Sequence, residues 1–449
     1  MKKEFYSKIF KLVLPIVIQN LLSAAISSAD VIMLNYTGQK SVSAVSLASN
    51  YASVLFSLLY GLGTGVTMLC AQYYGKKDME AIKIVQGVAL RFSLVGSLIF
   101  ALPAFFIPEM MMRIFTPDPA LIGIGAQYLR YMGVAYISWA IIEIYLSALR
   151  STGRVTVCTV LNVIAFVFNI LLNAVFIFGL FGAPKLGATG VAIATSASRL
   201  IELTGCIIVS ALSKDVKLDL RSIFVSNKML LKDFIKLSAP AIGNDIIWGL
   251  AFSMYAVIIG HLGEDAVAAN SYVVVVRNFG TVLCYAVASA GTILLGNTLG
   301  KNRLEEARED AGRLLKLAFF TGFIGGAIVL AVSPFAVWYA SLSFTPTALF
   351  YLKWMLLMNT YYITGTSVNT MLIAGVFRAG GDTKFGLICD TIDMWCYAVP
   401  LGLLAAFVFK LPVLVVYFLL CTDEFVKWPW VFKRYRSGKW VQNITREKY

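Results

Sequence analysis

Two carboxylates lie inside long apolar stretches of this chain, where a charged group costs about 2.5–3.5 kcal/mol to insert into a membrane. Asp30 ends a run of small and apolar residues that begins at Pro15, and Asp245 closely follows Pro240 in a similar run. Such residues are typically kept to bind a proton or a cation, although Asp30 could instead cap an interfacial turn. Each proline removes a backbone hydrogen bond and favours a kink. We therefore predict cation coupling at Asp30 and Asp245, with hinges at Pro15 and Pro240.

Two amides in an apolar segment are a second candidate for cation chemistry. Asn169 and Asn173 are four residues apart, so they share one face of a helix. Their oxygens can coordinate a cation or accept a hydrogen bond from a protonated carboxyl group. The alternative is that they only hydrogen-bond across helices, as polar residues in membrane bundles do.

Asp390 and Asp393 are three residues apart in another apolar segment and also share a face. They either supply negative charge to a functional site or neutralise a basic residue such as Arg277 or Lys384. The choice between these alternatives stays open at the level of sequence.

Two further charged pairs are predicted to be structural. Glu143 and Arg150 are two helical turns apart, and Arg199 and Glu202 are one turn apart. Helical spacing brings each pair together on one face. We expect each pair to be an ion pair.

Aromatic faces can hold organic cations by cation–π contact, and aromatic residues make up 13% of the chain. Those within apolar segments, together with nearby polar residues, are candidates for the lining of a cavity. These candidates are Tyr136, Trp139, Trp248, Tyr255, Tyr361, Asn369, Asp390, Asp393 and Trp395.

The elements that position these residues are predicted to be membrane helices. The chain of 449 residues is 59% hydrophobic and only 14% charged, with mean hydropathy +0.78. A membrane helix needs about 20 apolar residues, and twelve such segments recur, which predicts an all-α integral membrane protein. They are residues 9–34, 45–74, 88–110, 127–148, 157–181, 187–212, 234–260, 267–299, 313–340, 347–376, 385–408 and 411–432.

The net charge of +14 is explained by topology. Most of the 38 Lys and Arg residues lie at the termini and in alternate turns, the pattern of cytoplasmic loops. Both termini are thus expected in the cytoplasm, with the protein multi-pass in the plasma membrane. Nucleic acid is not expected as a partner, because its footprint would be a basic face on one soluble domain.

No cofactor or metal is expected. The seven cysteines show no metal-binding spacing. The run GLGTG at 61–65 lacks the preceding strand and following lysine of a nucleotide loop. Any energy source for this protein would therefore be an ion gradient, and an enzyme is not expected.

The chain contains an internal repeat. Lys11, Pro15, Gly38, Gly75 and Lys76 recur at a constant separation as Lys236, Pro240, Gly263, Gly300 and Lys301. Six helices per repeat predict two lobes related by an axis along the membrane normal, with a cavity between them. The expected domains are an N-terminal lobe at 1–212, a cytoplasmic linker at 213–233 and a C-terminal lobe at 234–449.

Several motifs in order resemble the multidrug and toxic compound extrusion family. They are AQYYGKKD, LRSTG, FNILLNAVFIFG, LGATGVAIAT, GEDAVAA, LLGNTLGKNRLEEA and FRAGGDT. The resemblance spans nearly the whole chain. It implies a cation-coupled antiporter that exports small amphipathic organic compounds, cationic ones above all, and we expect it to be a monomer.

The resemblance also implies roles for single residues. The first-lobe cation site would join Asp30 to Asn169, Asn173 and Thr195, and Asp245 would serve the second lobe. Many relatives carry an acid at the place of Asn173. One negative charge fewer weakens a sodium site, so the sequence favours protons, with sodium as the alternative.

Two other functions were weighed. A flippase of a lipid-linked precursor would need several cationic residues inside helices, and only Arg199 and Arg277 qualify. A membrane enzyme or receptor is disfavoured because the chain has one histidine and no metal motif.

Overall fold

The protein is described by a computed structural model that covers residues 2–213, 215–225, 227–342 and 344–447. Within these ranges the side chains of residues 2, 3, 24–32, 35, 39 and 220 are not described. The side chain of Asp30, a predicted coupling residue, therefore lies outside the described part of the chain.

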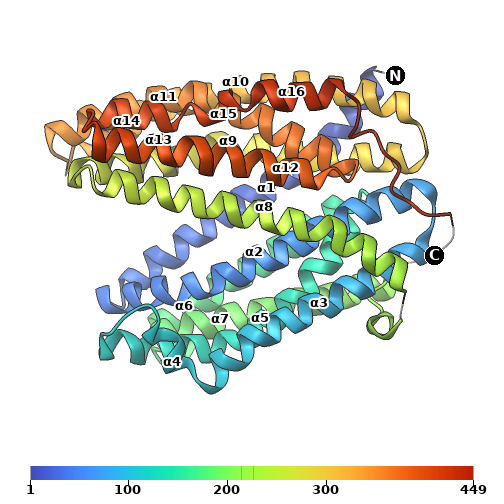
Figure 1. Cartoon of the computed structure of the whole chain (residues 1–449). Coiled ribbons are helices and arrows are strands. Elements are labelled where there is room, and N and C mark those ends of the chain that lie inside the picture. Colours follow the sequence, from blue (N-terminus) through green and yellow to red (C-terminus); the bar gives the residue numbers. More distant parts are fainter. Residues whose placement is uncertain (1, 214, 226, 343, 448–449) are drawn as a thin grey trace. The chain divides into compact units, whose positions relative to one another are not determined.

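The described residues form helices joined by short turns, so the predicted all-α membrane fold is confirmed (Figure 1). Ten of these helices are long and apolar enough to cross a membrane. The first half contains α1 (Lys2–Asn35), α2 (Gln39–Lys76), α3 (Met79–Phe106), α4 (Pro108–Arg113), α5 (Pro119–Ser151), α6 (Val155–Phe178) and α7 (Ala188–Leu212).

The second half repeats this order and adds irregular turns near its end. It contains α8 (Lys228–Gly260), α9 (Glu264–Gly300), α10 (Leu304–Ala340), α11 (Pro346–Thr370), α12 (Thr383–Thr391), α13 (Val399–Leu403), α14 (Val413–Leu420), α15 (Asp423–Val426) and α16 (Trp428–Arg436). Three π-helical segments, η3 (Met371–Phe377), η4 (Ile392–Ala398) and η5 (Leu404–Val408), interrupt the α-helical winding among the described residues. Each of the twelve predicted segments corresponds to a helix or to a run of consecutive helices.

Helix starts follow from local chemistry. Asp78 caps α3 by accepting a hydrogen bond from the Ala81 backbone N–H, and Asp118 caps α5 in the same way from Ala120. The repeat is also visible in the backbone. Gly38 before α2 and Gly263 before α9 both have a positive φ, of 102° and 116°, which glycine adopts without a Cβ clash.

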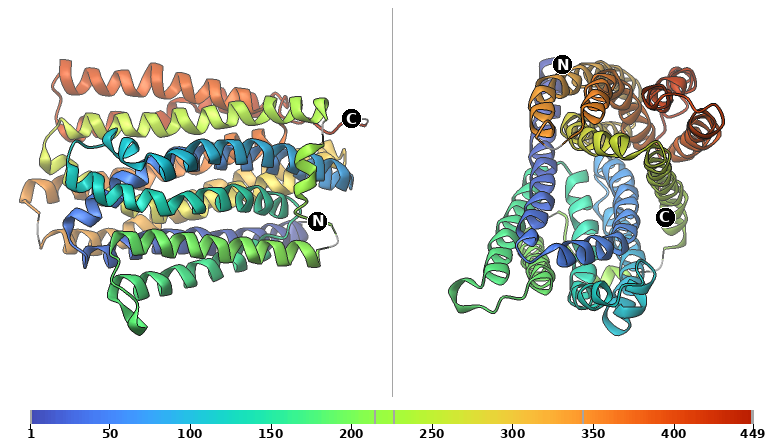
Figure 2. Two further views of the ribbon diagram at one scale, coloured as in Figure 1. Left: turned by 90° about the horizontal axis from the view of Figure 1, so that it is seen from below. Right: turned by 90° about the vertical axis from the view of Figure 1, so that its left-hand side faces the viewer.

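Contacts divide the chain into two compact units. We call Ile18–Ser238 with Arg446–Tyr449 the N-terminal unit, and Met1–Val17 with Ala239–Thr445 the C-terminal unit. In Figure 2 the helices of each unit are seen lengthwise in one view and nearly end-on in the other, so each unit is a helical bundle. The predicted domain boundaries at 212 and 233 stay a prediction.

The surface of both units is apolar along the helices. Ile99, Phe323 and Phe335 are each more than 60% exposed. Large exposed apolar surfaces are unusual for soluble monomers and suit contact with lipid.

One ion pair fixes the polar turn that follows α7. Lys83 at the start of α3 binds Asp219 at 2.7 Å. The hydrogen bond that Lys83 donates, together with its positive charge, lowers the pKa of the Asp219 carboxyl below its ordinary value.

Candidate functional site

The N-terminal unit brings together three residues predicted for cation coupling. The Asn173 amide on α6 donates to the Asn169 side-chain oxygen at 3.3 Å, and Asn169 donates to the Thr195 hydroxyl on α7 at 3.3 Å. Asn169 and Asn173 are both buried. The set is a row of neutral hydrogen-bonding groups, and Asp30 lies outside the described side chains.

This row opens onto a cavity of about 580 Å³ whose wall includes Asn169 and Thr195. Its charged residues are already paired. Arg150 binds Glu143 at 2.7 Å, and Arg199 binds Glu202 at 2.7 Å. Both predicted ion pairs are therefore confirmed.

An aromatic wall completes the cavity of the N-terminal unit. Trp139 lines it, and the Arg199 guanidinium lies 5.1 Å from the centre of the Trp139 ring. Phe56 packs beside Trp139 with ring centres 5.3 Å apart and the ring planes tilted by 39°. These faces offer cation–π contact to an organic cation, which would compete there with Arg199.

The C-terminal unit contains a buried cluster of charges around Lys427. The ammonium lies 3.3 Å from Asp390, 3.6 Å from Asp393 and 3.3 Å from Glu424. All four side chains are at most 7% exposed. Asp390 and Asp393 therefore neutralise Lys427, and the two partners weighed from the sequence, Arg277 and Lys384, are wrong.

Polar side chains from other helices surround this cluster. Asn244 on α8 donates to Asp390 at 2.7 Å, and Asn369 on α11 donates to Glu424 at 2.6 Å. The Asp393 position lies in the π-helical turn η4. Such turns are frequent at functional sites because they re-aim side chains.

The cluster holds more carboxyl groups than cations. Asp423 is fully buried beside it and adds a fourth carboxyl to Asp390, Asp393 and Glu424, with Lys427 as the only ammonium within 4 Å of them among the described residues. Both Asp393 oxygens lack a hydrogen-bond donor in the described part of the chain. A buried charge without compensation is strongly unfavourable. The excess negative charge of this cluster would therefore be neutralised by bound protons or by another cation.

The predicted coupling residue Asp245 has a different environment. Its carboxylate binds Arg378 at 2.7 Å, and Arg378 also donates to Asn244. The other carboxylate oxygen, Oδ2, is buried and has no hydrogen-bond partner among the described residues. A coupling ion at Asp245 could use this oxygen but would compete with the guanidinium for the negative charge. Asp245 is thus linked to the Lys427 cluster through two hydrogen-bonded residues, Arg378 and Asn244, the second of which donates to Asp390.

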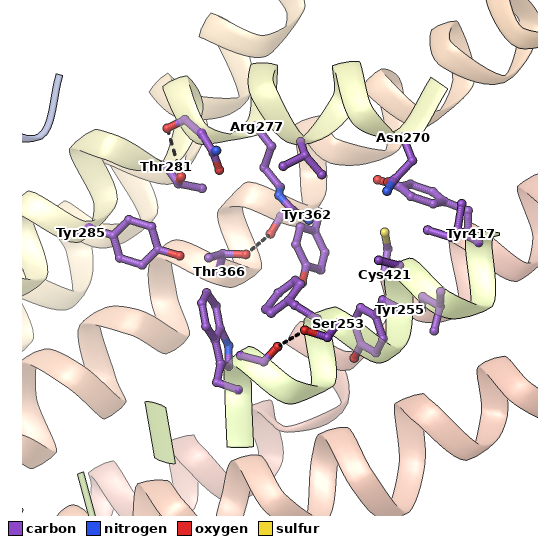
Figure 3. Close-up of a pocket in the computed structure, with 18 residues that line it drawn as sticks. Ser253, Tyr255, Asn270, Arg277, Thr281, Tyr285, Tyr362, Thr366, Tyr417 and Cys421 are labelled. Carbon is purple, nitrogen blue, oxygen red and sulfur yellow. Dashed lines mark hydrogen bonds between the residues drawn. The ribbon is translucent and has the colours of Figure 1, made fainter. Parts of the chain in front are cut away.

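The C-terminal unit also encloses a cavity, of about 620 Å³ (Figure 3). Trp248 and Tyr255, two of the aromatic candidates from the sequence, line it. The cavity is joined directly to the charged cluster. Tyr255 donates to Asp423 at 2.9 Å, and Thr366, which also lines the cavity, donates to Glu424 at 3.3 Å.

Other predicted cavity residues lie elsewhere. Tyr136 is fully buried in the core of the N-terminal unit, where its ring packs against Tyr51. Trp395 donates its indole N–H to the backbone oxygen of Ile247. Asn369, Asp390 and Asp393 belong to the polar network and not to the wall of the 620 Å³ cavity.

Sequence reasoning missed the centre of the cluster. Asp423, Glu424 and Lys427 fall in the last apolar segment, within the run DEFVK. The spacing of Glu424 and Lys427 predicts a helical ion pair, which was a usable signal. Lys427 instead looked like the first of the many basic residues of the C-terminal tail.

Comparison with known proteins agrees with this architecture. The family model MatE matches residues 15–175 and 240–420, once in each half of the chain. The chain belongs to the MatE family. This confirms the resemblance to multidrug and toxic compound extrusion transporters, and the two matches coincide with the internal repeat.

Relatives of this MatE chain include one named as a transporter and others named as probable multidrug resistance proteins. "Uncharacterized transporter YisQ" of Bacillus subtilis (strain 168) is 25% identical over 97% of this chain and 95% of its own length. "Probable multidrug resistance protein NorM" of Haemophilus ducreyi is 26% identical over 90% and 87%.

Solved structures share the fold. "Crystal structure of MATE in the bent conformation" superposes with a TM-score of 0.86 at 19% identity, covering 97% of this chain and 96% of that one. "Outward-facing conformation of a multidrug resistance MATE family transporter of the MOP superfamily" gives a TM-score of 0.86 at 20% identity, covering 96% of each. At this identity the likeness establishes the fold alone.

Proposed function

We propose that this MatE protein is a secondary active antiporter that exports small amphipathic organic compounds, organic cations among them, in exchange for protons. Sodium is the alternative coupling ion. Family membership supports export, since relatives such as YoeA of Bacillus subtilis bear the name "Probable multidrug resistance protein".

The observation that carries this proposal is the direct link between a charged cluster and a cavity in the C-terminal unit. Tyr255 and Thr366 line the cavity and donate hydrogen bonds to Asp423 and Glu424. A proton on either carboxyl group changes which of its oxygens can accept these bonds. Ion occupancy is thereby coupled to the wall that a transported compound would touch.

Protons are favoured over sodium by the chemistry of both units. Asn173 places a neutral amide in the N-terminal set. In the C-terminal unit the Lys427 ammonium already lies among the carboxylates, where a sodium ion would otherwise bind. No group of three or more His, Cys, Asp or Glu among the described residues is arranged to hold a metal ion.

We further propose that Pro15 and Pro240 are hinges. In support, the assignment of the chain to the two units changes inside α1 between Val17 and Ile18 and inside α8 between Ser238 and Ala239. Each change lies within two residues of a proline. A missing backbone hydrogen bond there makes bending easier.

The orientation in the membrane is also a proposal. The positive-inside pattern of Lys and Arg places both termini in the cytoplasm and suits the plasma membrane. We expect the monomer to be the working unit, with lipid as its only obligatory surroundings.

The test is efflux of a fluorescent organic cation from proteoliposomes, with a pH gradient alone and then a sodium gradient alone. We expect efflux on the pH gradient and its loss in Asp30→Asn, because the amide cannot exchange a proton. Glu305→Gln removes an 83% exposed carboxylate and is the matched control, expected to behave as wild type. Undiminished pH-driven efflux by Asp30→Asn would refute coupling through α1.

A further inference from the structure

The cavity of the C-terminal unit has a single charged residue in its wall. Of the 18 residues that line it, Arg277 alone is charged, and none is an Asp or Glu. In Figure 3 Arg277 extends from α9 toward Tyr362, with Tyr285 and Tyr417 on opposite sides of the view. The cavity is therefore an aromatic chamber with one fixed positive charge.

This guanidinium has no anionic partner among the described residues. Its one described interaction is with the Phe252 ring, whose centre lies 5.2 Å from the guanidinium carbon. Arg199 in the N-terminal cavity, by contrast, is paired with Glu202 at 2.7 Å. A partly buried guanidinium with five unused donors is a strong site for a planar carboxylate, which it can bind through two parallel hydrogen bonds.

The remaining wall suits a flat apolar body. Trp248, Phe252 and Tyr362 present aromatic faces, and Asn270 and Asn278 add amide groups on the Arg277 side of the cavity, on α9. Asp423, a carboxylate behind the wall, is fully buried and accepts a hydrogen bond from the Tyr255 hydroxyl. An organic cation would find no free counter-charge here and would meet Arg277.

We propose that this cavity selects compounds that carry an aromatic carboxylate, either as aromatic acids or as zwitterions, and that Arg277 binds the carboxylate. This inference rests on the proposed export function only for the statement that the bound compounds are exported. Binding itself needs no ion gradient, so the two can fail separately.

The experiment uses calorimetry to measure binding of small probes to the full chain in nanodiscs of zwitterionic lipid. This lipid carries no net negative charge. The probes are 2-naphthoate, 2-naphthamide and 2-naphthyltrimethylammonium, which share one ring system and differ in charge. We expect wild type to bind the carboxylate about tenfold to a hundredfold more tightly than the amide, the range for a charge-assisted hydrogen-bonded pair. The cation should bind most weakly.

Variants assign the preference to Arg277. Arg277→Gln should bind the carboxylate and the amide equally, and measurable binding of the amide reports a folded cavity. Arg277→Lys should keep part of the preference, since lysine keeps the positive charge but cannot donate two parallel hydrogen bonds to the carboxylate. Arg130→Gln removes an arginine 49% exposed at its side chain in the other unit and should change nothing.

Two results would overturn the proposal. One is a wild type that does not prefer the carboxylate to the amide, which decides the matter even if Arg277→Gln fails to fold. The other is an Arg277→Gln variant that keeps the full preference. Either result leaves gradient-driven efflux of an organic cation untouched, and failed efflux would leave the binding preference standing.

Discussion

The two units are built from one repeat but place their charges differently. In the N-terminal unit the predicted cation site consists of neutral Asn169, Asn173 and Thr195 among the described residues, and the nearby charges form two closed ion pairs. In the C-terminal unit four carboxyl groups gather about Lys427, while Arg277 stays unpaired. A shared helical scaffold therefore constrains the fold without fixing the chemistry of its interior.

The largest effect that this contrast predicts follows loss of Lys427. Lys427→Met should lower the free energy of unfolding by about 3–5 kcal/mol, as when one partner of a buried ion pair is removed. The thermal midpoint in detergent measures it. Lys427→Met combined with Asp393→Asn should recover part of the loss.

The matched control in the other unit is Arg150→Met. Glu143, its partner, is 17% exposed and also accepts from Ser147, so its charge stays better solvated. We expect a clearly smaller loss of stability than for Lys427→Met. Equal losses would mean that the two units do not differ in how they carry buried charge.

A second prediction moves the N-terminal unit toward the acidic character of the C-terminal unit. Asn173→Asp adds a carboxylate to the row formed with Asn169 and Thr195. Sodium-driven efflux should rise about tenfold, the factor that corresponds to about 1.4 kcal/mol of added cation affinity. Proteoliposomes with a sodium gradient and no pH gradient provide the measurement.

Asn162→Asp serves as the control for this gain. Asn162 lines the same cavity but donates to the backbone oxygen of Cys158 and not to the Asn169 row. An equal gain from Asn162→Asp would show that added charge anywhere in the cavity suffices, and the row would lose its special role.

The smallest predicted effect concerns the turn after α7. The lowered pKa of Asp219 means that its ion pair with Lys83 stabilises the protein above the ordinary carboxyl pKa of about 3.9 and loses this effect as the pH falls through the lowered value. Lys83→Met should cost about 0.2–1 kcal/mol at neutral pH, as for exposed pairs.

Thermal midpoints of Lys83→Met and wild type, compared from neutral pH into the acid range, check this sign. The difference should begin to shrink below the ordinary carboxyl pKa of about 3.9, where the unfolded state takes up its proton, and should vanish below the lowered pKa of Asp219 in the folded protein. Lys77→Met, which removes a basic residue with no described ion pair, is the control. A difference that grows on acidification would contradict the assignment.

The membrane helices, the repeat and the local ion pairs are all predictable from the sequence without the structure. Apolar length fixes a spanning helix because lipid leaves backbone groups no other partner, and helical spacing alone pairs Arg199 with Glu202. The positions of Gly38 and Gly263 likewise follow from backbone sterics that only glycine escapes.

Tertiary structure decided which distant charges meet. The sequence allowed Asp390 to form an ion pair with Arg277 or Lys384. Instead, packing of the last helices against η4 brings Lys427 within ion-pair distance of Asp390. The same packing leaves Arg277 facing a cavity without a carboxylate. Burial raises the energetic weight of each such contact, but which groups share a buried site depends on how helices pack, and no local pattern encodes that.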